Sequence, residues 1–306
     1  MEKILIIKHG ALGDFVIAMG TMFDIRKQHP NAELHLLTGK AFVNMAKKMG
    51  IFSDYIIDNR ISYLHVAETM RILRAVAAGG YSMIYDLQAS SRTTRKYFPV
   101  LRWMIPHSYI WVDGHFGTFR HIEKKSAFGP GKLTDEPREI IWKTTDLSFL
   151  HGDNKELDSL PEKYVLMISG CSPTHPYKRW PVASFSALAK RLAERGISTV
   201  LIGTNAEAAE VNAIAAATPL AVSMLNKTSL MDVPDLARRA LATVGNDTGP
   251  SHMAALSGGP TIALYDNRTR MSVTQGPQSV NLVSDSTIDL ITVDMVWEKL
   301  ERFLNV

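Results

Sequence analysis

The chain has 306 residues, of which 46% are hydrophobic and 21% charged, and it carries a formal net charge of +4 with a pI near 9.0. This length allows two hydrophobic cores of about 150 residues each, and no apolar run approaches the ~18 residues of a membrane span. A single cysteine, Cys171, excludes an internal disulfide and fits a reducing compartment. Because the N-terminal segment turns polar too early for a signal peptide, we expect a soluble protein of the cytoplasm.

The first half of the chain alternates strand-like apolar runs with helix-like segments. A helix is expected to follow the loop His9–Asp14 and to run through Arg26. The expected strands are Lys3–Lys8, Glu33–Leu37, Tyr55–Asp58 and Met83–Asp86. This alternation predicts an α/β architecture with mainly parallel sheets.

Basic and aromatic residues gather together between Arg92 and Lys125. The basic residues form three groups, at 92–98, 102–103 and 120–125. The aromatic residues between them are Tyr97, Trp103, Tyr109, Trp111 and Phe116. Such a segment suits an anionic partner at a membrane surface or a nucleic acid, but a solvated face above aromatic packing explains it equally well.

Polar and glycine-rich segments punctuate the middle of the chain, at 129–137 and 151–161, and we place a domain boundary near residue 155. Beyond it, the strand–loop–helix pattern restarts. The restart predicts two similar domains, 1–155 and 156–306, with an active site in the cleft between them, because ligands bind at the carboxyl ends of parallel strands.

The second half repeats the order of strand, loop and helix. A helix is expected from about Val182 to Glu194. The expected strands are 164–169, 199–203, 243–245 and 261–265. Apolar residues at helical spacing predict a C-terminal helix at about 294–305 that packs back on the N-terminal domain.

The segment Val244–Leu256 carries the strongest binding signal, because glycines and a proline stand where a turn becomes a helix. Pro250 suits a first helical turn, where its missing N–H group costs nothing. The N–H groups from Thr248 to Met253 would then face outward at the positive end of the helix dipole, which favours a diphosphate. Lys178 precedes another helix in reach of the same edge, although a solvated lysine is the alternative interpretation.

Several common enzyme classes lack their motifs. The loop His9–Asp14 is neither a dinucleotide-binding glycine motif nor a phosphate loop of nucleoside triphosphatases. No Asp-x-Asp motif occurs, and no His, Cys or Asp grouping has the spacing of metal ligands, so we predict neither a metal nor a cofactor.

Two acidic residues each allow two interpretations. Asp14 would serve as a general base for a hydroxyl nucleophile, or would cap the helix that begins beside it. Glu207 would accept hydrogen bonds from ribose hydroxyls, or would complement the dipole of a first helical turn.

Three segments in order, Lys3–Asp14, Lys178–Pro181 and Gly245–Ala255, resemble the successive signatures of glycosyltransferase family 9. These enzymes are the heptosyltransferases of the inner core of bacterial lipopolysaccharide. The resemblance runs from residue 3 to about 265. It implies a GT-B fold, in which two Rossmann-like domains face each other across a cleft, the N-terminal one binding the acceptor and the C-terminal one the ADP-activated heptose.

The resemblance also implies roles for single residues. Asp14 matches the catalytic base, Lys178 the diphosphate-binding lysine that assists departure of ADP, and Glu207 the ribose contact. The donor-binding loop is matched by Asp247, Thr248, Gly249 and His252. The loop before Lys178 departs from the hydroxyl-rich pattern of the family because it holds two prolines, yet Ser172 and Thr174 stay donor-binding candidates. The acceptor-binding candidates are Gly13, Gln88, Arg92 and Arg95.

The implied reaction is an inverting transfer of heptose from ADP-heptose to the lipopolysaccharide core, onto a Kdo or a heptose residue. The enzyme would act in the cytoplasm, or peripherally on the inner face of the cytoplasmic membrane, without a nucleic acid partner; the sequence predicts no oligomeric state. Two alternatives stay open, a GT-B enzyme that uses another nucleotide sugar and a non-catalytic module that binds an anionic glycolipid.

Overall fold

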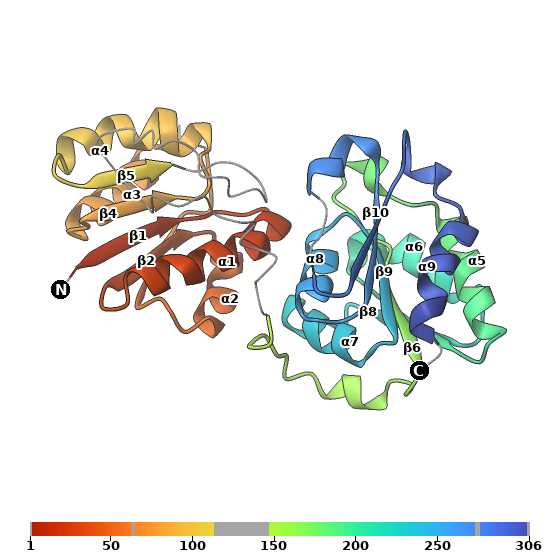
Figure 1. Ribbon diagram of the computed structural model, residues 1–306. Coiled ribbons are helices and arrows are strands. Elements are labelled where there is room, and N and C mark those ends of the chain that lie inside the picture. The colour runs from red at the N-terminus through yellow and green to blue at the C-terminus, as the bar shows by residue number, and fades with distance from the viewer. Residues whose placement is uncertain (1, 63–64, 113–146, 273–275, 305–306) are drawn as a thin grey trace. The chain divides into compact units, whose positions relative to one another are not determined.

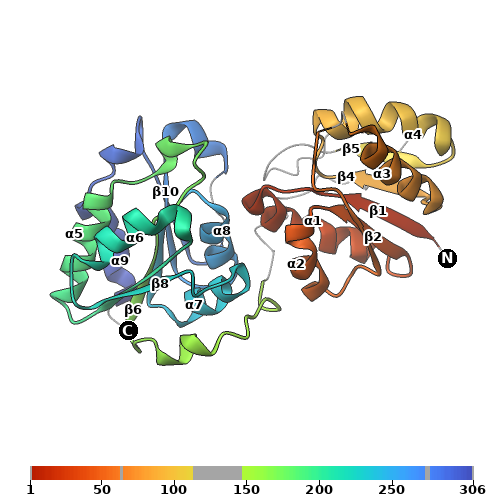
Figure 2. The same cartoon turned by 180° about the vertical axis from the view of Figure 1, so that it is seen from behind.

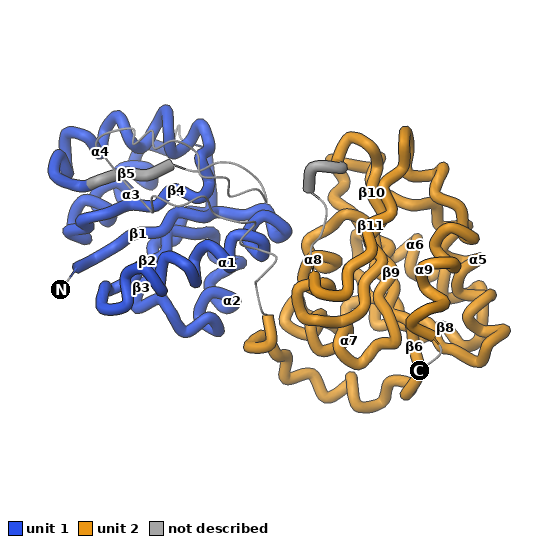
Figure 3. The backbone as a smooth tube through the Cα atoms, viewed as in Figure 1, with its two compact units in different colours: residues 1–145 blue, residues 146–306 orange. Residues whose placement is uncertain are grey.

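The computed structural model describes residues 2–62, 65–112, 147–272 and 276–304. The chain divides into two compact units, Met1–Thr145 and Asp146–Val306 (Figure 3). This division lies upstream of the boundary expected near residue 155. Each unit contains its own parallel sheet, so the two similar halves of the sequence correspond to two separate folding cores.

The described part of unit 1 contains a five-stranded sheet in the order β3-β2-β1-β4-β5 (Figure 1). Each strand of this sheet pairs in parallel with its neighbours. The strands are β1 (Lys3–Ile7), β2 (Glu33–Thr38), β3 (Asp54–Ile57), β4 (Met83–Asp86) and β5 (Tyr109–Val112). The first four confirm the prediction to within about a residue at each end, whereas β5 lies in the basic and aromatic stretch and was not predicted.

Helices cover both faces of this sheet, with α1 and α2 on one face and α3 and α4 on the other (Figures 1 and 2). Their bounds are α1 (Leu12–Gln28), α2 (Val43–Lys48), α3 (Val66–Ala78) and α4 (Phe98–Met104). A π-helical turn, η2 (Thr93–Tyr97), leads into α4. Apolar residues of α3 and α4 share one core with β1 and β4, including Ile72, Leu101 and Ile84.

The described part of unit 2 contains a six-stranded sheet in the order β11-β10-β9-β6-β7-β8, again with parallel pairs. The strands are β6 (Tyr164–Ile168), β7 (Ser198–Gly203), β8 (Ala221–Leu225), β9 (Ala242–Asn246), β10 (Thr261–Tyr265) and β11 (Ser279–Val283). The helices are α5 (Val182–Ala193), α6 (Ala208–Ala215), α7 (Val233–Arg239), α8 (Gly249–Leu256) and α9 (Val293–Leu304). Buried strands of this kind read as continuous apolar runs, which is why the sequence pattern revealed most of them.

The C-terminal helix α9 forms as predicted, but its apolar face is used within unit 2. Val296, Trp297 and Leu300 are buried in the same core as Trp180, at the start of α5. The indole Nε1 of Trp180 donates to the carbonyl of Ile291, 2.7 Å away, just before α9. The stripe expected to pack on the N-terminal domain therefore completes the core of the C-terminal one.

Both sheets are doubly wound, and this confirms the predicted α/β class. In unit 1 the strand order reverses between β1 and β4, and in unit 2 between β6 and β9. Open parallel sheets bind ligands beyond the carboxyl ends of the strands at such a switch point. The loops that follow these four strands carry most of the predicted site residues.

None of the described helices has the length and hydropathy that crossing a bilayer requires.

Candidate functional site

The loop between β9 and α8 has the strand–turn–helix form predicted from the sequence. Thr248 is the N-cap of α8, and Pro250 lies in the first turn. The Ser251 hydroxyl donates to the carbonyl of Asn246 at 2.6 Å and lies 3.3 Å from the Thr248 hydroxyl. These contacts hold the start of α8 against the end of β9, so that the N-terminus of the helix is fixed at the carboxyl edge of the sheet.

Three predicted donor-site residues meet at this helix start. Lys178 Nζ lies 2.7 Å from Oδ2 of Asp247, and Nε2 of His252 lies 3.4 Å from Oδ1. Burial would raise the pKa of the Asp247 carboxyl, but the hydrogen bonds from His252 and Lys178 hold it below its usual value. The Asp247 side chain is 3% exposed and that of Lys178 21%, so a buried carboxylate anchors a cation that reaches solvent.

Asn246 positions this cluster, a role that the sequence analysis did not assign. Its Nδ2 donates to the carbonyl of Ser169 at 2.7 Å, and its Oδ1 accepts from the backbone N–H of Trp180 at 3.0 Å. The fully buried amide thereby ties the ends of β6 and β9 to the segment that carries Lys178. A polar side chain that ends an otherwise apolar strand was the available signal.

Gly245 allows the close packing of the same loop. A Cβ atom at this position would lie 2.5 Å from the Ser251 hydroxyl and 3.0 Å from Cβ of Ile168. Only a residue without a side chain permits the approach of β6, β9 and α8.

The proline-containing loop before Lys178 places its hydroxyl groups at the surface. Ser172 and Thr174 are exposed, and their hydroxyl oxygens lie 2.8 Å apart. Thr174 Oγ1 also lies 2.9 Å from Nδ1 of His175. The two hydroxyls are thus engaged with their own loop, and their contact with a donor stays a prediction.

Glu207 lies in a first helical turn, as one of its two interpretations expected, and there it completes a capping box. Its Oε2 accepts from the backbone N–H of Thr204 at 2.8 Å and from the Thr204 hydroxyl at 2.7 Å, which forms a capping box. The side chain also lies against Gly170, where a Cβ atom would be 2.7 Å from Cγ of Glu207. The structure therefore places Glu207 beside the loop after β6, with Oε2 used locally.

In unit 1, Asp14 lies in the first turn of α1 and is partly buried, next to Gly13. The N-cap of this helix is Ala11, so Asp14 is the third residue of the helix, where the alternative interpretation as a helix-terminus residue stays open. A carboxylate in the first turn is stabilised by the helix dipole. Asp14 follows β1 at the switch point of the sheet, as expected for a residue that meets a ligand there.

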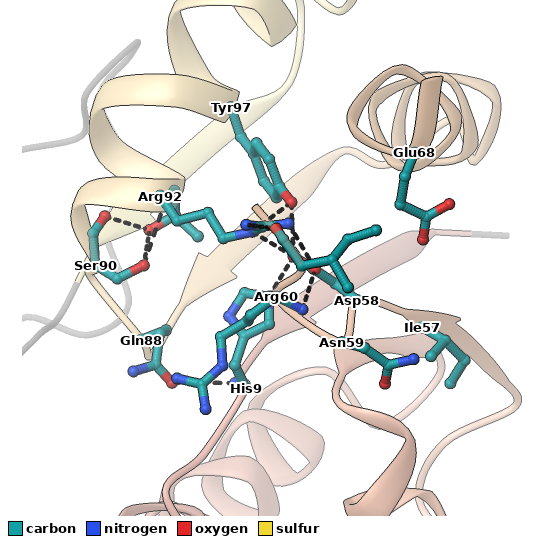
Figure 4. Close-up of polar contacts among 12 residues, drawn as sticks. His9, Ile57, Asp58, Asn59, Arg60, Glu68, Gln88, Ser90, Arg92 and Tyr97 are labelled. Carbon is teal, nitrogen blue, oxygen red and sulfur yellow. Dashed lines mark hydrogen bonds and ion pairs between the residues drawn. The ribbon is translucent and has the colours of Figure 1, made fainter. Parts of the chain in front are cut away.

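A buried charge cluster around Asp58 lies near this loop (Figure 4). Asp58 accepts hydrogen bonds from His9 Nε2 at 2.9 Å and from the Tyr97 hydroxyl at 2.6 Å. Nε and Nη2 of Arg92 each lie 2.9 Å from one of its two oxygens. Burial would raise the pKa of the Asp58 carboxyl, but these partners hold it well below its usual range.

This cluster changes the interpretation of two predicted acceptor contacts. Besides its bonds to Asp58, Arg92 donates through Nη1 to the carbonyl of Ile61 at 2.7 Å, so each of its guanidinium nitrogens is engaged. Oε1 of Gln88 accepts from the backbone N–H of His9 at 3.0 Å. Both side chains therefore brace the loop after β1, whereas Arg95 is exposed on η2.

Comparison with known proteins identifies the family. The model of glycosyltransferase family 9 (heptosyltransferase) matches residues 134–288. Lipopolysaccharide heptosyltransferase 2 of Escherichia coli K12 is 34% identical over 291 residues, which cover 86% of this chain and 82% of the relative. The chain belongs to glycosyltransferase family 9.

Solved structures agree with a GT-B fold for this glycosyltransferase. The structure of E. coli ADP-heptose LPS heptosyltransferase II superposes with a TM-score of 0.72 and 18% identity, covering 99% of this chain and 98% of that one. A family 9 glycosyltransferase from Veillonella parvula DSM 2008 gives a TM-score of 0.76 at 15% identity, with 99% and 97% covered. The fold thus extends over both units of the enzyme.

The basic and aromatic stretch between Arg92 and Lys125 contains both buried and exposed aromatic side chains. Tyr97 is buried in the Asp58 cluster, whereas Trp103 on α4 is 86% exposed. The basic group 120–125 and Phe116 lie outside the described residues, as do the side chains of Tyr109 and Trp111. Neither of the two interpretations of the stretch accounts for all of it.

Proposed function

We propose that this glycosyltransferase moves a heptose from ADP-heptose to the inner core of lipopolysaccharide, onto a Kdo or a heptose residue, with inversion at the anomeric carbon. The relative named lipopolysaccharide heptosyltransferase 2, similar along 86% of the chain, supports the reaction class. A structural neighbour, the E. coli heptosyltransferase WaaC, is described with ADP-2-deoxy-2-fluoro heptose, which supports an ADP-sugar donor. The observation that carries the proposal is the contact of Lys178, Asp247 and His252 at the N-terminus of α8.

This cluster suits the diphosphate of the donor. Positive charge and donors for phosphate oxygens come from the ammonium group of Lys178 and the N–H groups of Thr248, Gly249 and Ser251. The N–H of His252 is not available, because it donates to the carbonyl of Thr248 at 3.1 Å. Asp247 holds the cation in place before the ligand arrives, so little reorganisation is needed as charge grows on the departing ADP. Preorganised electrostatic stabilisation of this kind is often the largest contribution to catalysis.

The rest of the donor would be held by the neighbouring loops. Oε1 of Glu207 would accept from a ribose hydroxyl, while Oε2 keeps its capping bonds to Thr204. Ser172 and Thr174 would donate to phosphate oxygens from the exposed loop before Lys178.

Asp14 supplies the base in this mechanism. Its carboxylate accepts the proton of an acceptor hydroxyl while that oxygen forms a bond to the anomeric carbon. The bond from the anomeric carbon to the phosphate oxygen breaks on the opposite face, through an oxocarbenium-like transition state, and ADP leaves with the bonding electrons. General-base assistance contributes about 10²–10⁴-fold to the rate of such a step.

We assign the acceptor to unit 1, near Gly13, Gln88 and Arg95. The exposed guanidinium of Arg95 suits a carboxylate or phosphate of the core. Arg92 contributes indirectly, because its bonds to Asp58 and Ile61 hold the surrounding loops.

The proposed reaction uses Lys178 and α8, rather than a metal ion, to neutralise the diphosphate. Within the described ranges there is no group of three or more His, Cys, Asp or Glu side chains placed to hold a metal. Turnover that persists after chelation would support a metal-free mechanism, and turnover that requires an added divalent cation would contradict it.

Mass spectrometry of reaction products tests the proposed function. ADP-heptose would be incubated with a panel of truncated core acceptors, and we expect one acceptor to gain the mass of a single heptose residue. Thermal shift titrations with ADP, UDP and GDP should show stabilisation by ADP, because a bound nucleotide stabilises the folded state. Stabilisation by UDP or GDP alone would indicate another nucleotide sugar, and no transfer to any acceptor would favour a binding module.

A further inference from the structure

Two neighbouring strands of unit 2 end in the same charged arrangement. Asp247 follows β9 and Asp266 follows β10, and the N–H of Asp247 donates to the carbonyl of Leu264 at 3.1 Å, so the strand ends lie side by side. The two carboxylate side chains are 3% and 0% exposed. Their cationic partners, Lys178 and Arg268, are 21% and 56% exposed. Each buried carboxylate therefore holds a cation that reaches solvent at the ligand-binding edge of the sheet.

The guanidinium of Arg268 is fixed along one edge by Asp266. Nε donates to Oδ1 at 2.6 Å and Nη2 to Oδ2 at 2.8 Å, and the backbone N–H of Arg268 adds a bond to Oδ1 at 3.0 Å. Such paired bonds define the plane of the group as well as its position.

Tyr177 fixes one face of the same guanidinium. Cζ of Arg268 lies 3.9 Å from the centroid of the Tyr177 ring, and Tyr177 directly precedes Lys178 in the chain. The two cations are therefore attached to one short segment between β6 and α5. Among the described residues, no acceptor lies within hydrogen-bond distance of Nη1, so the outer edge of Arg268 keeps donors for a ligand.

We propose that Arg268 and Lys178 form a two-cation site for a substrate oxyanion, and that the diphosphate of the donor occupies it. A planar group held by a buried carboxylate and an aromatic ring loses little freedom when it binds, and its fork of donors matches phosphate oxygens. The identity of the donor rests on the function proposed above. A phosphate or carboxylate of the acceptor has the same chemistry, so the experiment must separate the two sources.

Arg191 offers a matched control. It too stacks on an aromatic ring, with Cζ 4.3 Å from the centroid of the Trp297 ring, and pairs with a carboxylate, 2.6 Å from Oδ1 of Asp294. However, the Asp294 side chain is 88% exposed, and the pair joins α5 to α9, whereas Asp266 and Arg268 both lie in the segment that follows β10. Substitution of Arg191 removes the same kinds of contact without touching the proposed site.

The test is calorimetric titration of Arg268→Gln, Arg268→Lys and Arg191→Gln with ADP and, separately, with inorganic pyrophosphate. We expect Arg268→Gln to weaken both ligands by about tenfold, the size of one lost charge-assisted contact. Arg268→Lys should recover part of this loss, because the charge remains without the fork of donors. Arg191→Gln should match the unsubstituted chain within about twofold, since exposed ion pairs contribute little.

The other possible outcomes separate the source of the oxyanion from the existence of the site. If ADP affinity is unchanged in Arg268→Gln but KM for the acceptor rises by about tenfold, the site is supported and its oxyanion belongs to the acceptor. If neither quantity changes, the inference is overturned. Binding of pyrophosphate that depends on Arg268, in a chain that transfers no heptose, would support the site and contradict the proposed function.

Discussion

Both units place a buried aspartate directly after a strand, Asp58 after the edge strand β3 and Asp247 after the central strand β9. The two sites differ in how far the donors of the cationic partner are already bonded. In unit 1, every guanidinium nitrogen of Arg92 donates to Asp58 or Ile61. In unit 2, the Lys178 ammonium has three N–H donors, and Asp247 accepts only one direct contact from it. Each guanidinium nitrogen of Arg92 is thus already bonded, and the closed cluster of His9, Asp58, Arg92 and Tyr97 stabilises the fold. Among the described residues, Asp247 is the acceptor of the Lys178 ammonium in the open cluster of Lys178, Asp247 and His252, so the other N–H groups of Lys178 remain for a ligand.

The largest effect should come from Asp14, a residue of unit 1 that is not part of the Asp58 cluster. Asp14→Asn keeps the shape of the side chain but removes the proposed base, so turnover should fall by about 10²–10⁴-fold. ADP affinity should stay the same, because Asp14 belongs to unit 1 and the donor cluster to unit 2. Steady-state kinetics and calorimetry measure the two quantities.

Asp24→Asn is the matched control for this substitution. Asp24 lies on the same helix, 3.9 Å from Lys27, and should be replaceable without loss of turnover. Near-normal turnover in Asp14→Asn would remove Asp14 from the mechanism.

The closed cluster should affect stability rather than ligand binding. Asp58→Asn leaves the buried His9 and Arg92 without their anion, and such a break costs about 3–5 kcal/mol. Urea unfolding should show the loss, while the ADP affinity of the folded fraction stays unchanged. If Asp58→Asn has normal stability but weakened ADP binding, the Asp58 cluster binds the ligand rather than stabilising the fold, and the difference proposed between the two units is wrong.

The same cluster should make stability depend on pH in acid. Because the pKa of Asp58 is lowered in the folded state, the unfolded state binds a proton first as pH falls below about 4. The stabilisation by Asp58 is therefore fully present above the unfolded pKa and is lost progressively below it. The free energy of unfolding should therefore fall less steeply between about pH 5 and 2 in Asp58→Asn than in the unsubstituted protein. An equal fall in both proteins would contradict this role of Asp58.

Substitution in the cluster of Lys178, Asp247 and His252 should instead weaken ligand binding. Lys178→Ala should weaken ADP binding by about 10–100-fold, since hydrogen bonds to charged groups contribute about 1.5–3 kcal/mol. Lys190→Ala, which removes an exposed lysine from α5, serves as the control and should bind ADP normally. Equal ADP affinity in both variants would contradict a diphosphate site at Lys178.

The sequence predicts the open cluster better than the closed one, for a physical reason. Asp247, Thr248, Gly249 and His252 belong to one strand–turn–helix segment, so local backbone chemistry already reveals the loop. The Asp58 cluster joins His9, Asp58, Arg92 and Tyr97, and no local spacing shows that they meet. The sequence analysis therefore proposed Arg92 as an acceptor contact, whereas in the structure each of its guanidinium nitrogens bonds to Asp58 or Ile61.

The same distinction applies to the folds of the two units. Alternating apolar runs revealed the first four strands of unit 1, but not β5, whose aromatic residues lie among basic ones. In unit 2 the sequence analysis missed β8 and β11, the two edge strands of the sheet. The stacking of Arg268 on Tyr177 joins residues far apart in the chain and has no sequence signature.

The smallest effect concerns α4, which exposes Arg102 and Trp103. Trp103 is 86% exposed, and Arg102 next to it in the chain and Arg95 on η2 are exposed as well. No acidic residue lies between Asp86 and Asp113 in the sequence. A basic surface with an exposed tryptophan suits an anionic membrane, where each basic residue contributes about 1 kcal/mol. Arg102→Gln should therefore weaken binding to phosphatidylglycerol vesicles by about fivefold, as measured by sedimentation.

Two further variants separate a membrane surface from general adhesion. Trp103→Ser should also release the protein from the vesicles, whereas Leu290→Ser, at an apolar side chain of unit 2 that is 57% exposed, should not. High salt should abolish the contribution of Arg102 but not that of Trp103, because screening acts on charge and not on apolar burial. If Leu290→Ser and Trp103→Ser release the protein equally, α4 is not a specific membrane-binding surface.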